Sequence, residues 1–276
     1  MLKNPVITLL TDFGYRDHYV GSMKGVILSI APHAAIVDIS HCVPKFDVRA
    51  GAYLLKAAYK YFPQGTIHVA VVDPGVGTQR RSIVIKTSSY IFIGPDNGLL
   101  APAALEDGVQ EVRLIENPRL TRGKVSRTFH GRDIFAPVAA YLACGLPFEE
   151  VGPLIEDGLN IPSFAQPEIK AGYLACEVLY IDDFGNVVLN ATASDVGRSG
   201  LTYGTRCKIE LKGSVEIEAP LLPSYGYVVE GETLLLINSE DHLELAVNRG
   251  NAAVRYGLAT GDRIVIKASP QLSGSF

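Results

Sequence analysis

The sequence is poor in three features that indicate particular classes of protein. Its longest basic run is Arg80-Arg81 and its net charge is −4, which argues against a nucleic-acid-binding protein. Its first apolar stretch, residues 6–10, is too short for a signal peptide or a membrane span. It has only four cysteines, none in a C-x-x-C pair: Cys42, Cys144, Cys176 and Cys207. We therefore expect neither a zinc site nor a disulfide framework, but a soluble cytoplasmic protein with reduced cysteines in its core.

What is present is an ordinary globular composition. Hydrophobic residues make up 47% of the 276 residues and charged residues 20%, so one large domain or two smaller ones can bury a core. The first half alternates apolar strand-like runs with segments of helical periodicity, which indicates parallel strands joined by right-handed crossovers. The predicted strands are residues 6–10, 35–39, 66–72, 82–86 and 90–93, the first two as buried strands, and the predicted helices are residues 17–31, 46–62 and 131–144.

The pattern changes in the second half of the chain. Residues 162–172 carry two prolines and little periodicity, so we interpret them as a linker between domains 1–161 and 173–276. Short strands separated by turn residues follow, as in a small β-barrel or sandwich. We predict no helix of any length before residues 251–258, and we place the strands at residues 173–181, 187–190, 207–211, 215–217, 233–237, 243–247 and 263–266.

Polar residues follow the strands of the first half at the sheet edge where open parallel sheets bind ligands. Asp12 follows the first strand, His41 the second, Asp73 the third, and Asp96 the strand at residues 90–93. Each also has an ordinary structural interpretation, because Asp caps turns and a histidine is often a partly buried core residue. Two aspartates near glycines at equivalent strand ends favour a site modestly. The segment 75–77 lacks the spacing of a dinucleotide-binding fingerprint.

Two further segments are candidates. Residues 128–133 place His130 and Gly131 at the start of a helix, where unpaired backbone N–H groups can bind a polar ligand. Residues 182–186 form a short polar segment between two strands, and their spacing by itself favours a simple hairpin turn. Phe46 has the default interpretation of a core aromatic that starts its helix, and Arg80-Arg81 that of a solvated strand entry.

Six motifs in order along the chain resemble the S-adenosylmethionine hydroxide adenosyltransferases, relatives of fluorinase and chlorinase. They are TDFG at 11–14, VVDPGVG at 71–77, GPDNGLL at 94–100, FHGRDIFAP at 129–137, IDDFGN at 181–186 and INSEDHLELAVNRGNAA at 237–253. The resemblance implies an α/β N-terminal domain with a mainly parallel sheet and a small C-terminal β-barrel. It also implies a homotrimer, with each active site between the N-terminal domain of one subunit and the C-terminal domain of another.

The resemblance implies roles for individual residues. Asp73, Arg80 and His130 match the catalytic triad of the water-using members, and Asp12 matches the carboxylate that holds the ribose hydroxyls. The other implied substrate-binding residues are Phe46, Phe129, Gly131, Asp182, Asn186, Tyr225, Ser239, Val247 and Asn248. Among these, Asp182 and Asn186 would hold methionine and adenine, Tyr225 would stack on adenine, and Ser239 would lie near the methionine carboxylate. The backbone near Val247 and Asn248 would meet the adenine edge.

Five positions bear on the choice of nucleophile or on substrate binding. Halide-using members carry tyrosine in place of Asp73, whereas Gly131 resembles the chlorinase; Asp73, Arg80 and His130 together favour water. Glu240 departs from the pattern, because the fluorinase has an arginine there beside the methionine carboxylate.

The resulting hypothesis is hydrolysis of S-adenosyl-L-methionine to adenosine and L-methionine, without metal or cofactor. Asp73 and His130 would hold the water and accept its proton, and Arg80 would favour its hydroxide-like state. Three alternatives remain open: a chlorinase, a metal-dependent phosphohydrolase with Asp12, His41, Asp73 and His130 as ligands, and a non-catalytic adenosine-binding protein.

Overall fold

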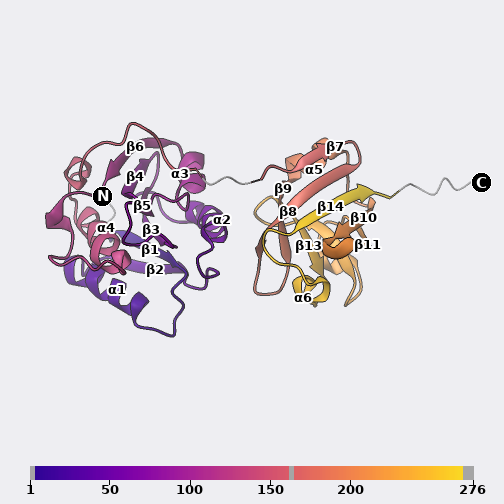
Figure 1. Ribbon diagram of the computed structural model, residues 1–276, viewed down its shortest axis with the longest axis horizontal. Coiled ribbons are helices and arrows are strands. Elements are labelled where there is room, and N and C mark those ends of the chain that lie inside the picture. The colour runs from indigo at the N-terminus through magenta and orange to yellow at the C-terminus, as the bar shows by residue number, and fades with distance from the viewer. Residues whose placement is uncertain (1–3, 162–164, 270–276) are drawn as a thin grey trace, which may run out of the picture. The chain divides into compact units, whose positions relative to one another are not determined.

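The computed structural model describes residues 4–161 and 165–269 (Figure 1). The chain divides into two compact units, Met1–Pro162 and Ser163–Phe276. Residues 162–164 of the expected linker lie outside the described residues. Residues 168–170 of that segment form a strand, β7, that pairs with β8, so this part of the expected linker belongs to the C-terminal sheet.

The N-terminal unit is built on a mixed, mostly parallel sheet of six strands. Their order is β2-β1-β3-β5-β4-β6, parallel from β2 to β5 and antiparallel from β5 to β6. The strands are β1 Val6–Thr11, β2 Ala35–Ser40, β3 Ile67–Val71, β4 Ser82–Thr87, β5 Ile91–Pro95 and β6 Val109–Leu114. The helices are α1 Tyr19–Ile30, α2 Val48–Ala58, α3 Ala101–Asp107 and α4 Ala136–Ala143.

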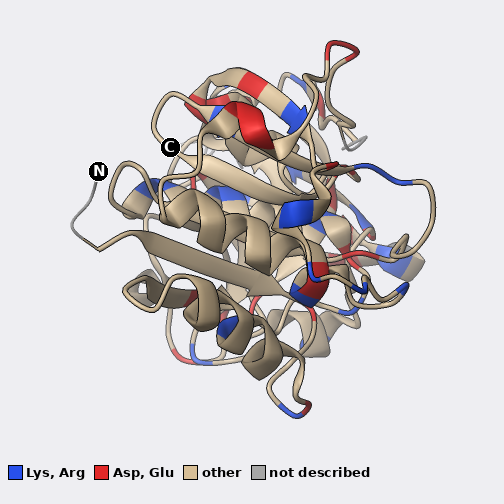
Figure 2. Ribbon diagram, turned by 90° about the vertical axis from the view of Figure 1, so that its left-hand side faces the viewer, with Lys and Arg blue, Asp and Glu red and all other residues tan. Residues whose placement is uncertain are grey.

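Apolar runs explain the centre of this sheet. Strands β1 and β3 are almost wholly buried, as expected for parallel strands covered on both faces. In Figure 2 the elements at the centre of the view are largely tan, and charged residues lie mainly at their ends and in the loops. The prediction of β2 as a buried strand was wrong: β2 is the edge strand, with only β1 beside it, and its residues are partly exposed.

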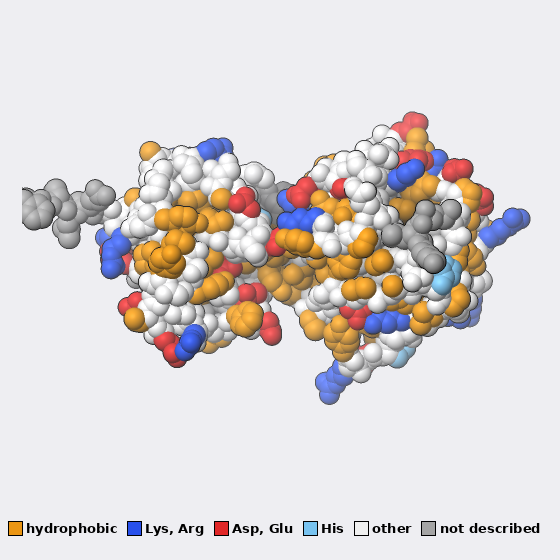
Figure 3. All heavy atoms as spheres, turned by 180° about the vertical axis from the view of Figure 1, so that it is seen from behind, with side chains coloured by type: hydrophobic (Ala, Val, Ile, Leu, Met, Phe, Trp, Pro, Cys, Tyr) orange, Lys and Arg blue, Asp and Glu red, His pale blue; other side chains and the backbone are white. Residues whose placement is uncertain are grey.

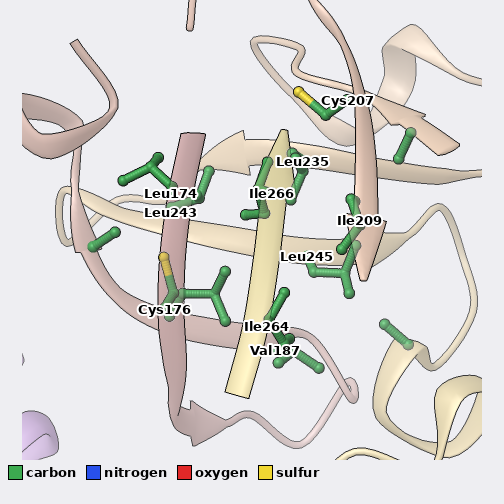
Figure 4. Packing of buried hydrophobic residues seen from close by; sticks show 14 of the residues in the cluster. Leu174, Cys176, Val187, Cys207, Ile209, Leu235, Leu243, Leu245, Ile264 and Ile266 are labelled. Atoms are coloured by element: carbon green, nitrogen blue, oxygen red, sulfur yellow. The ribbon is translucent and has the colours of Figure 1, made fainter. Parts of the chain in front are cut away.

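The C-terminal unit is an antiparallel, barrel-like sheet. The strand order is β11-β10-β14-β8-β9-β13-β12, and a bridge between Leu221 and Leu235 brings its two ends together. The elements are β7 Glu168–Lys170, β8 Tyr173–Ile181, β9 Val187–Thr192, α5 Ala193–Ser199, β10 Arg206–Leu211, β11 Val215–Pro220, β12 Thr233–Ile237, β13 His242–Val247, α6 Ala252–Tyr256 and β14 Arg263–Ala268. Alternate residues of these strands point into one apolar core, shown in Figure 4.

Besides β7, the sequence patterns missed β6, α3 and α5, and they placed Phe46 in the wrong structure. Strand β6 alternates too weakly in hydrophobicity, and helices α3 and α5 have seven residues each. Helix α5 does carry a start signal, since Thr192 and Asp195 form a capping box. Phe46 was expected to start its helix as a core residue. Instead Asp47 caps α2, and Phe46 lies outside the helix with 70% of its surface exposed.

The cysteines are partly as predicted. All four are free, and Cys176 and Cys207 lie in the C-terminal core (Figure 4), where burial raises the pKa of the Cys176 thiol to about 12 and that of Cys207 to about 11. Cys42 and Cys144 are exposed, so the expectation of core positions was wrong for them. Cys42 follows the edge strand β2, and Cys144 caps the end of α4; neither place faces a core.

Candidate active site

The candidate site of the N-terminal unit lies at the carboxyl edge of the sheet. Asp12 follows β1 directly and Asp73 follows β3 after one residue. Because β1 and β3 are parallel neighbours in register, both carboxylates emerge at the same edge.

Asp73, Arg80 and His130 form one hydrogen-bonded cluster. Arg80 Nε lies 2.9 Å from Asp73 Oδ1 and Arg80 Nη2 lies 2.5 Å from Asp73 Oδ2, a bidentate pair. The same Nη2 lies 2.7 Å from His130 Nδ1, and Nη1 donates to Ser82 Oγ at 2.6 Å. Only 10% of the Arg80 side chain and 5% of the Asp73 side chain are exposed. The geometry thus brings the three predicted catalytic residues together.

The contact with Arg80 decides the protonation state of His130. A guanidinium can only donate, so Nδ1 of His130 accepts, and the neutral ring carries its proton on Nε2. Burial lowers the pKa of His130 below its usual value, and the Arg80 cation lowers this pKa further. His130 in this arrangement is therefore a hydrogen-bond donor through Nε2.

Two glycines make this cluster possible. Gly77 has a φ of +77°, and a Cβ there would lie 2.1 Å from the backbone oxygen of Arg127. Gly131 follows His130 at the start of a π-helical turn, Gly131–Phe135, of a kind often found at functional sites. A Cβ on Gly131 would lie 3.1 Å from Met23 Sδ and 3.5 Å from the rings of Phe13 and Phe129. Gly131 is thus buried against these side chains, which by itself accounts for the glycine.

Asp12 is held by a strained neighbour. The backbone N–H of Phe46 donates to Asp12 Oδ2 at 2.9 Å, and Lys45 Nζ donates to the Asp12 backbone oxygen. Phe46 has a φ of +65°, which is rare for a bulky residue and typical of functional positions. This backbone turns its ring toward solvent while its N–H fixes the carboxylate.

Phe129 lies in an aromatic cluster beside the site. Its ring packs edge-on against Phe13 at 5.8 Å and Tyr19 at 5.1 Å between centroids, and only 6% of the residue is exposed. Phe129 therefore packs within this aromatic cluster next to His130, and little of its own surface is available to a ligand.

Asp96 has a structural role. Its Oδ2 accepts from Arg81 Nε at 2.7 Å, and its Oδ1 accepts from the Asn160 backbone N–H at 2.9 Å. Asn97 Nδ2 donates to the Val72 backbone oxygen. These bonds fasten the end of the N-terminal unit to the sheet edge, which agrees with the interpretation of this segment as a structural turn.

The C-terminal unit has its own open pocket, of about 780 Å³. It is lined by Asp182, Phe184, Asn186, Tyr225, Val247, Asn248, Arg249, Gly250 and Asn251. Five of the six predicted substrate-binding residues of this half are thus brought together. The exception is Ser239, which lies exposed in the turn between β12 and β13, outside this set of residues.

Close packing of two distant motifs forms this pocket. Gly185 has a φ of +82°, and a Cβ there would lie about 2.0 Å from the side chain of Asn251. Asp182 accepts from both the backbone N–H and the side-chain amide of Asn186, at 2.8 and 2.9 Å. Asn248 donates from its side chain to the Val228 backbone oxygen and from its backbone to Glu232, so its N–H groups hold the neighbouring loop.

The buried carboxylate of Glu244, below the pocket, was not predicted from the sequence. Tyr225 donates its hydroxyl to Glu244 Oε1 at 2.7 Å, and Glu244 is 3% exposed. Burial raises the pKa of Glu244, against the opposing hydrogen bonds from Tyr225 and Asn238. The signal was a single acid inside the apolar strand β13. Four other pocket residues were also missed, although all of them lie in the quoted motifs: Phe184, Arg249, Gly250 and Asn251.

The four ligands of the phosphohydrolase alternative do not form a metal site. His41 contacts Thr11 and Asp38, and His130 and Asp73 both contact Arg80. Over the described residues, no three His, Cys, Asp or Glu side chains are grouped as metal ligands.

In the part of the chain that the structure describes, no helix is both long and apolar enough to cross a membrane. On the face shown in Figure 3, basic side chains are dispersed.

Comparisons with known proteins agree with this geometry. The chain is 40% identical to a protein from Salinispora tropica named (R)-S-adenosyl-L-methionine hydrolase, over 97% of this chain and 100% of that protein. It is 31% identical to a fluorinase from Actinoplanes sp., over 95% and 97% of the two chains. The crystal structure of a conserved protein from Thermotoga maritima superposes with a TM-score of 0.89 at 40% identity, covering 95% and 99%.

Both units match one family. Residues 7–152 match the SAM hydroxide adenosyltransferase N-terminal domain, and residues 176–265 match the C-terminal domain of the same family. The chain belongs to the SAM hydroxide adenosyltransferase family.

Proposed function

We propose that this protein is an enzyme that uses water to split S-adenosyl-L-methionine into adenosine and L-methionine. The observation that carries the proposal is the Asp73–Arg80–His130 cluster at the sheet edge. Relatives at 38–40% identity over nearly the whole chain are named as hydrolases of this substrate.

The chemistry asks little of the leaving group and much of the nucleophile. The C5′–sulfur bond breaks with its electron pair going to the sulfonium sulfur, which becomes the neutral thioether of methionine. A water oxygen forms the new bond to C5′ in line with the departing sulfur, and positioning this water lowers the barrier. A metal or cofactor is not needed, because the leaving sulfur is already cationic.

The cluster assigns different tasks to its members. His130 presents Nε2–H, so it donates to the water oxygen and orients it; the hypothesis that His130 accepts the proton does not fit this tautomer. Asp73 is the acceptor for the proton that the water loses, and the Arg80 cation stabilises the negative charge that develops on oxygen. The proton then passes to solvent, and adenosine leaves with a 5′-hydroxyl.

We assign substrate recognition to both units. Asp12, held by the Phe46 backbone, accepts the two ribose hydroxyls. In the C-terminal pocket, Asp182 and Asn186 bind the methionine and adenine parts, and Tyr225 stacks on adenine. Each half alone leaves a large aromatic side chain exposed: Phe46 at 70% and Phe184 at 78%.

Assembly follows from this division in our proposal. The N-terminal half-site of one copy would meet the C-terminal pocket of a second copy in a homotrimer, which would cover these aromatic rings. Sedimentation and assay at the same concentration test this, since a fully active monomer contradicts it. The four free cysteines support a reducing, cytoplasmic setting.

Product analysis tests the reaction. The substrate is incubated with enzyme in chloride-free and chloride-containing buffers, without added metal. We expect equal amounts of adenosine and methionine in both buffers. A main product of 5′-chloro-5′-deoxyadenosine in chloride would indicate a chlorinase, and binding without turnover a non-catalytic adenosine-binding protein. Loss of activity on chelation would revive the metal-dependent alternative.

A further inference from the structure

A buried histidine, His41, stands next to the ribose-binding loop and takes no part in the chemistry above. His41 is 0% exposed and follows the edge strand β2. Its Nδ1 lies 2.7 Å from Thr11 Oγ1, which is also fully buried. Its Nε2 lies 3.1 Å from Asp38 Oδ1, and Asp38 Oδ2 accepts from Lys24 Nζ at 2.7 Å.

The hydrogen bonds from Phe13 through Thr11 to His41 run in one direction. The backbone N–H of Phe13 donates to Thr11 Oγ1 at 3.1 Å. The Thr11 hydroxyl can then donate its own proton to Nδ1 of a neutral His41, which leaves Nε2–H facing Asp38. The Nε2–Asp38 contact is close but is not aligned as a hydrogen bond. A protonated His41 would instead donate to Thr11 and leave the Thr11 proton without this partner.

The electrostatics favour the neutral ring. Burial lowers the pKa of His41, against the opposing effect of Asp38. Lys24 and His41, against the opposing effect of burial, lower the pKa of Asp38. Lys24 thus compensates the Asp38 charge from the outer side, and the neutral His41 ring keeps its Nδ1 as the acceptor for the Thr11 hydroxyl.

These hydrogen bonds hold one loop, residues 11–14. Thr11 and Phe13 flank Asp12, and the backbone oxygen of His41 accepts from the Gly14 N–H at 2.7 Å. His41 therefore holds the loop 11–14 with its ring and with its backbone. Phe13 in turn packs on Phe129, the residue before His130.

We propose that Thr11, His41 and Asp38 are positioning residues that hold the loop 11–14 so that the Asp12 carboxylate meets the ribose hydroxyls. This proposal rests on the proposed function for the role of Asp12. None of the three touches the reacting atoms, so they act on binding through Asp12 and not on the nucleophile.

The same strand contains a matched control. Thr8 is fully buried in β1 and its Oγ1 lies 2.8 Å from Nδ1 of the fully buried His68. This second Thr–His pair is alike in chemistry and burial, but it lies in the middle of the strand and contacts no residue of the loop 11–14 among its hydrogen bonds. A merely structural role predicts the same consequences for both pairs.

The experiment compares Thr11→Val, Thr11→Ser and Thr8→Val. Thr11→Val removes the hydroxyl at nearly constant volume, so we expect adenosine affinity by calorimetry to fall about tenfold, with a similar rise in KM and kcat within about threefold. Thr11→Ser should restore wild-type affinity. Thr8→Val should lower the melting temperature and leave adenosine affinity unchanged. Wild-type affinity in Thr11→Val, or an equal loss in Thr8→Val, would overturn the proposal.

A second readout needs no ligand. Amide hydrogen exchange of Phe13 and Gly14 should accelerate in Thr11→Val and, severalfold less, in Asp38→Ala, but not in Thr8→Val; unchanged exchange would also overturn the proposal. The wild-type hydrolysis assay tests the proposed function separately. Wild-type protein that binds adenosine without turnover would reject hydrolysis and leave the comparison valid, whereas wild-type protein that binds no adenosine would overturn both.

Discussion

In our proposal, the two units of the chain contribute different kinds of half-site. The N-terminal unit holds a nearly buried cluster of ionised and hydrogen-bonded groups whose orientation the protein itself determines. The C-terminal unit holds an open pocket lined mainly by amides and aromatic rings, with one aspartate and one arginine. Preorganised charge is what a transition state needs, and an open, adaptable surface is enough for recognition. This difference agrees with our proposal, which assigns the chemistry to the first unit and most of the recognition to the second.

The largest effect is expected from substitutions that break the N-terminal cluster. Arg80→Ala and His130→Ala should lower kcat by about 10²- to 10⁴-fold with KM nearly unchanged, because both groups act on the water and not on the substrate. Arg81→Ala is the matched control, since Arg81 is also paired with an aspartate but contacts neither Asp73 nor His130 in its hydrogen bonds. Near wild-type kcat in both test variants would reject the triad mechanism.

A smaller effect is expected at the ribose carboxylate. Asp12→Ala should weaken binding of both adenosine and substrate by about 10- to 100-fold, since charge-assisted hydrogen bonds contribute about 1.5–3 kcal/mol. Calorimetry with adenosine measures this directly. Asp96→Ala offers a comparison, because Asp96 stands at the same sheet edge but is committed to Arg81 and Asn160. Equal losses in the two variants would show that Asp12 acts through stability alone.

The C-terminal pocket should respond in binding and not in chemistry. Asn186→Ala should raise KM about tenfold and leave kcat within about threefold, as expected when one neutral hydrogen-bonding partner is lost. Ser239→Ala provides the contrast, since Ser239 is exposed and is not among the residues that line the pocket. Steady-state kinetics of both variants decide whether the pocket is a recognition site; a fall in kcat with constant KM in Asn186→Ala would contradict the division of tasks.

The smallest effect on activity is expected away from both half-sites, where the change concerns stability. Burial lowers the pKa of His68 to about 3, whereas the unfolded chain has a value near 6.5. The unfolded state therefore binds one more proton between these values, so this contribution is fully present above pH ~6.5 and is lost as the pH falls toward 3. The slope is about 1.4 kcal/mol per pH unit. Thermal melts of wild type and His68→Gln should converge on acidification, and parallel curves would contradict the assignment.

Much of the fold could be predicted because apolar runs describe burial within one segment. Residues 173–181 and 233–237 form strands at the predicted bounds. The failures have a common cause. The edge position of β2 depends on which strand lies beside it, and the outward turn of Phe46 depends on a backbone angle that hydrophobicity does not report.

Site prediction divided in the same way. The aspartates at the sheet edge followed from strand order, and the family resemblance brought Arg80 and His130 into consideration. The tautomer of His130, the carboxylate of Glu244 below Tyr225 and the absence of Ser239 from the pocket lining were not predictable from the residues alone.

The sequence by itself determined the alternation of strands and helices, the change of architecture near residue 162 and the chemical groups available to a site. Tertiary structure alone decided which of these groups face one another. Hydrophobic periodicity depends on neighbours a few residues apart, so it is written locally in the chain. A proton on Nε2 of His130, or the hold of His41 on the loop 11–14, depends on single side-chain contacts between segments 30 to 50 residues apart. Such contacts exist only once the sheet has brought those segments together.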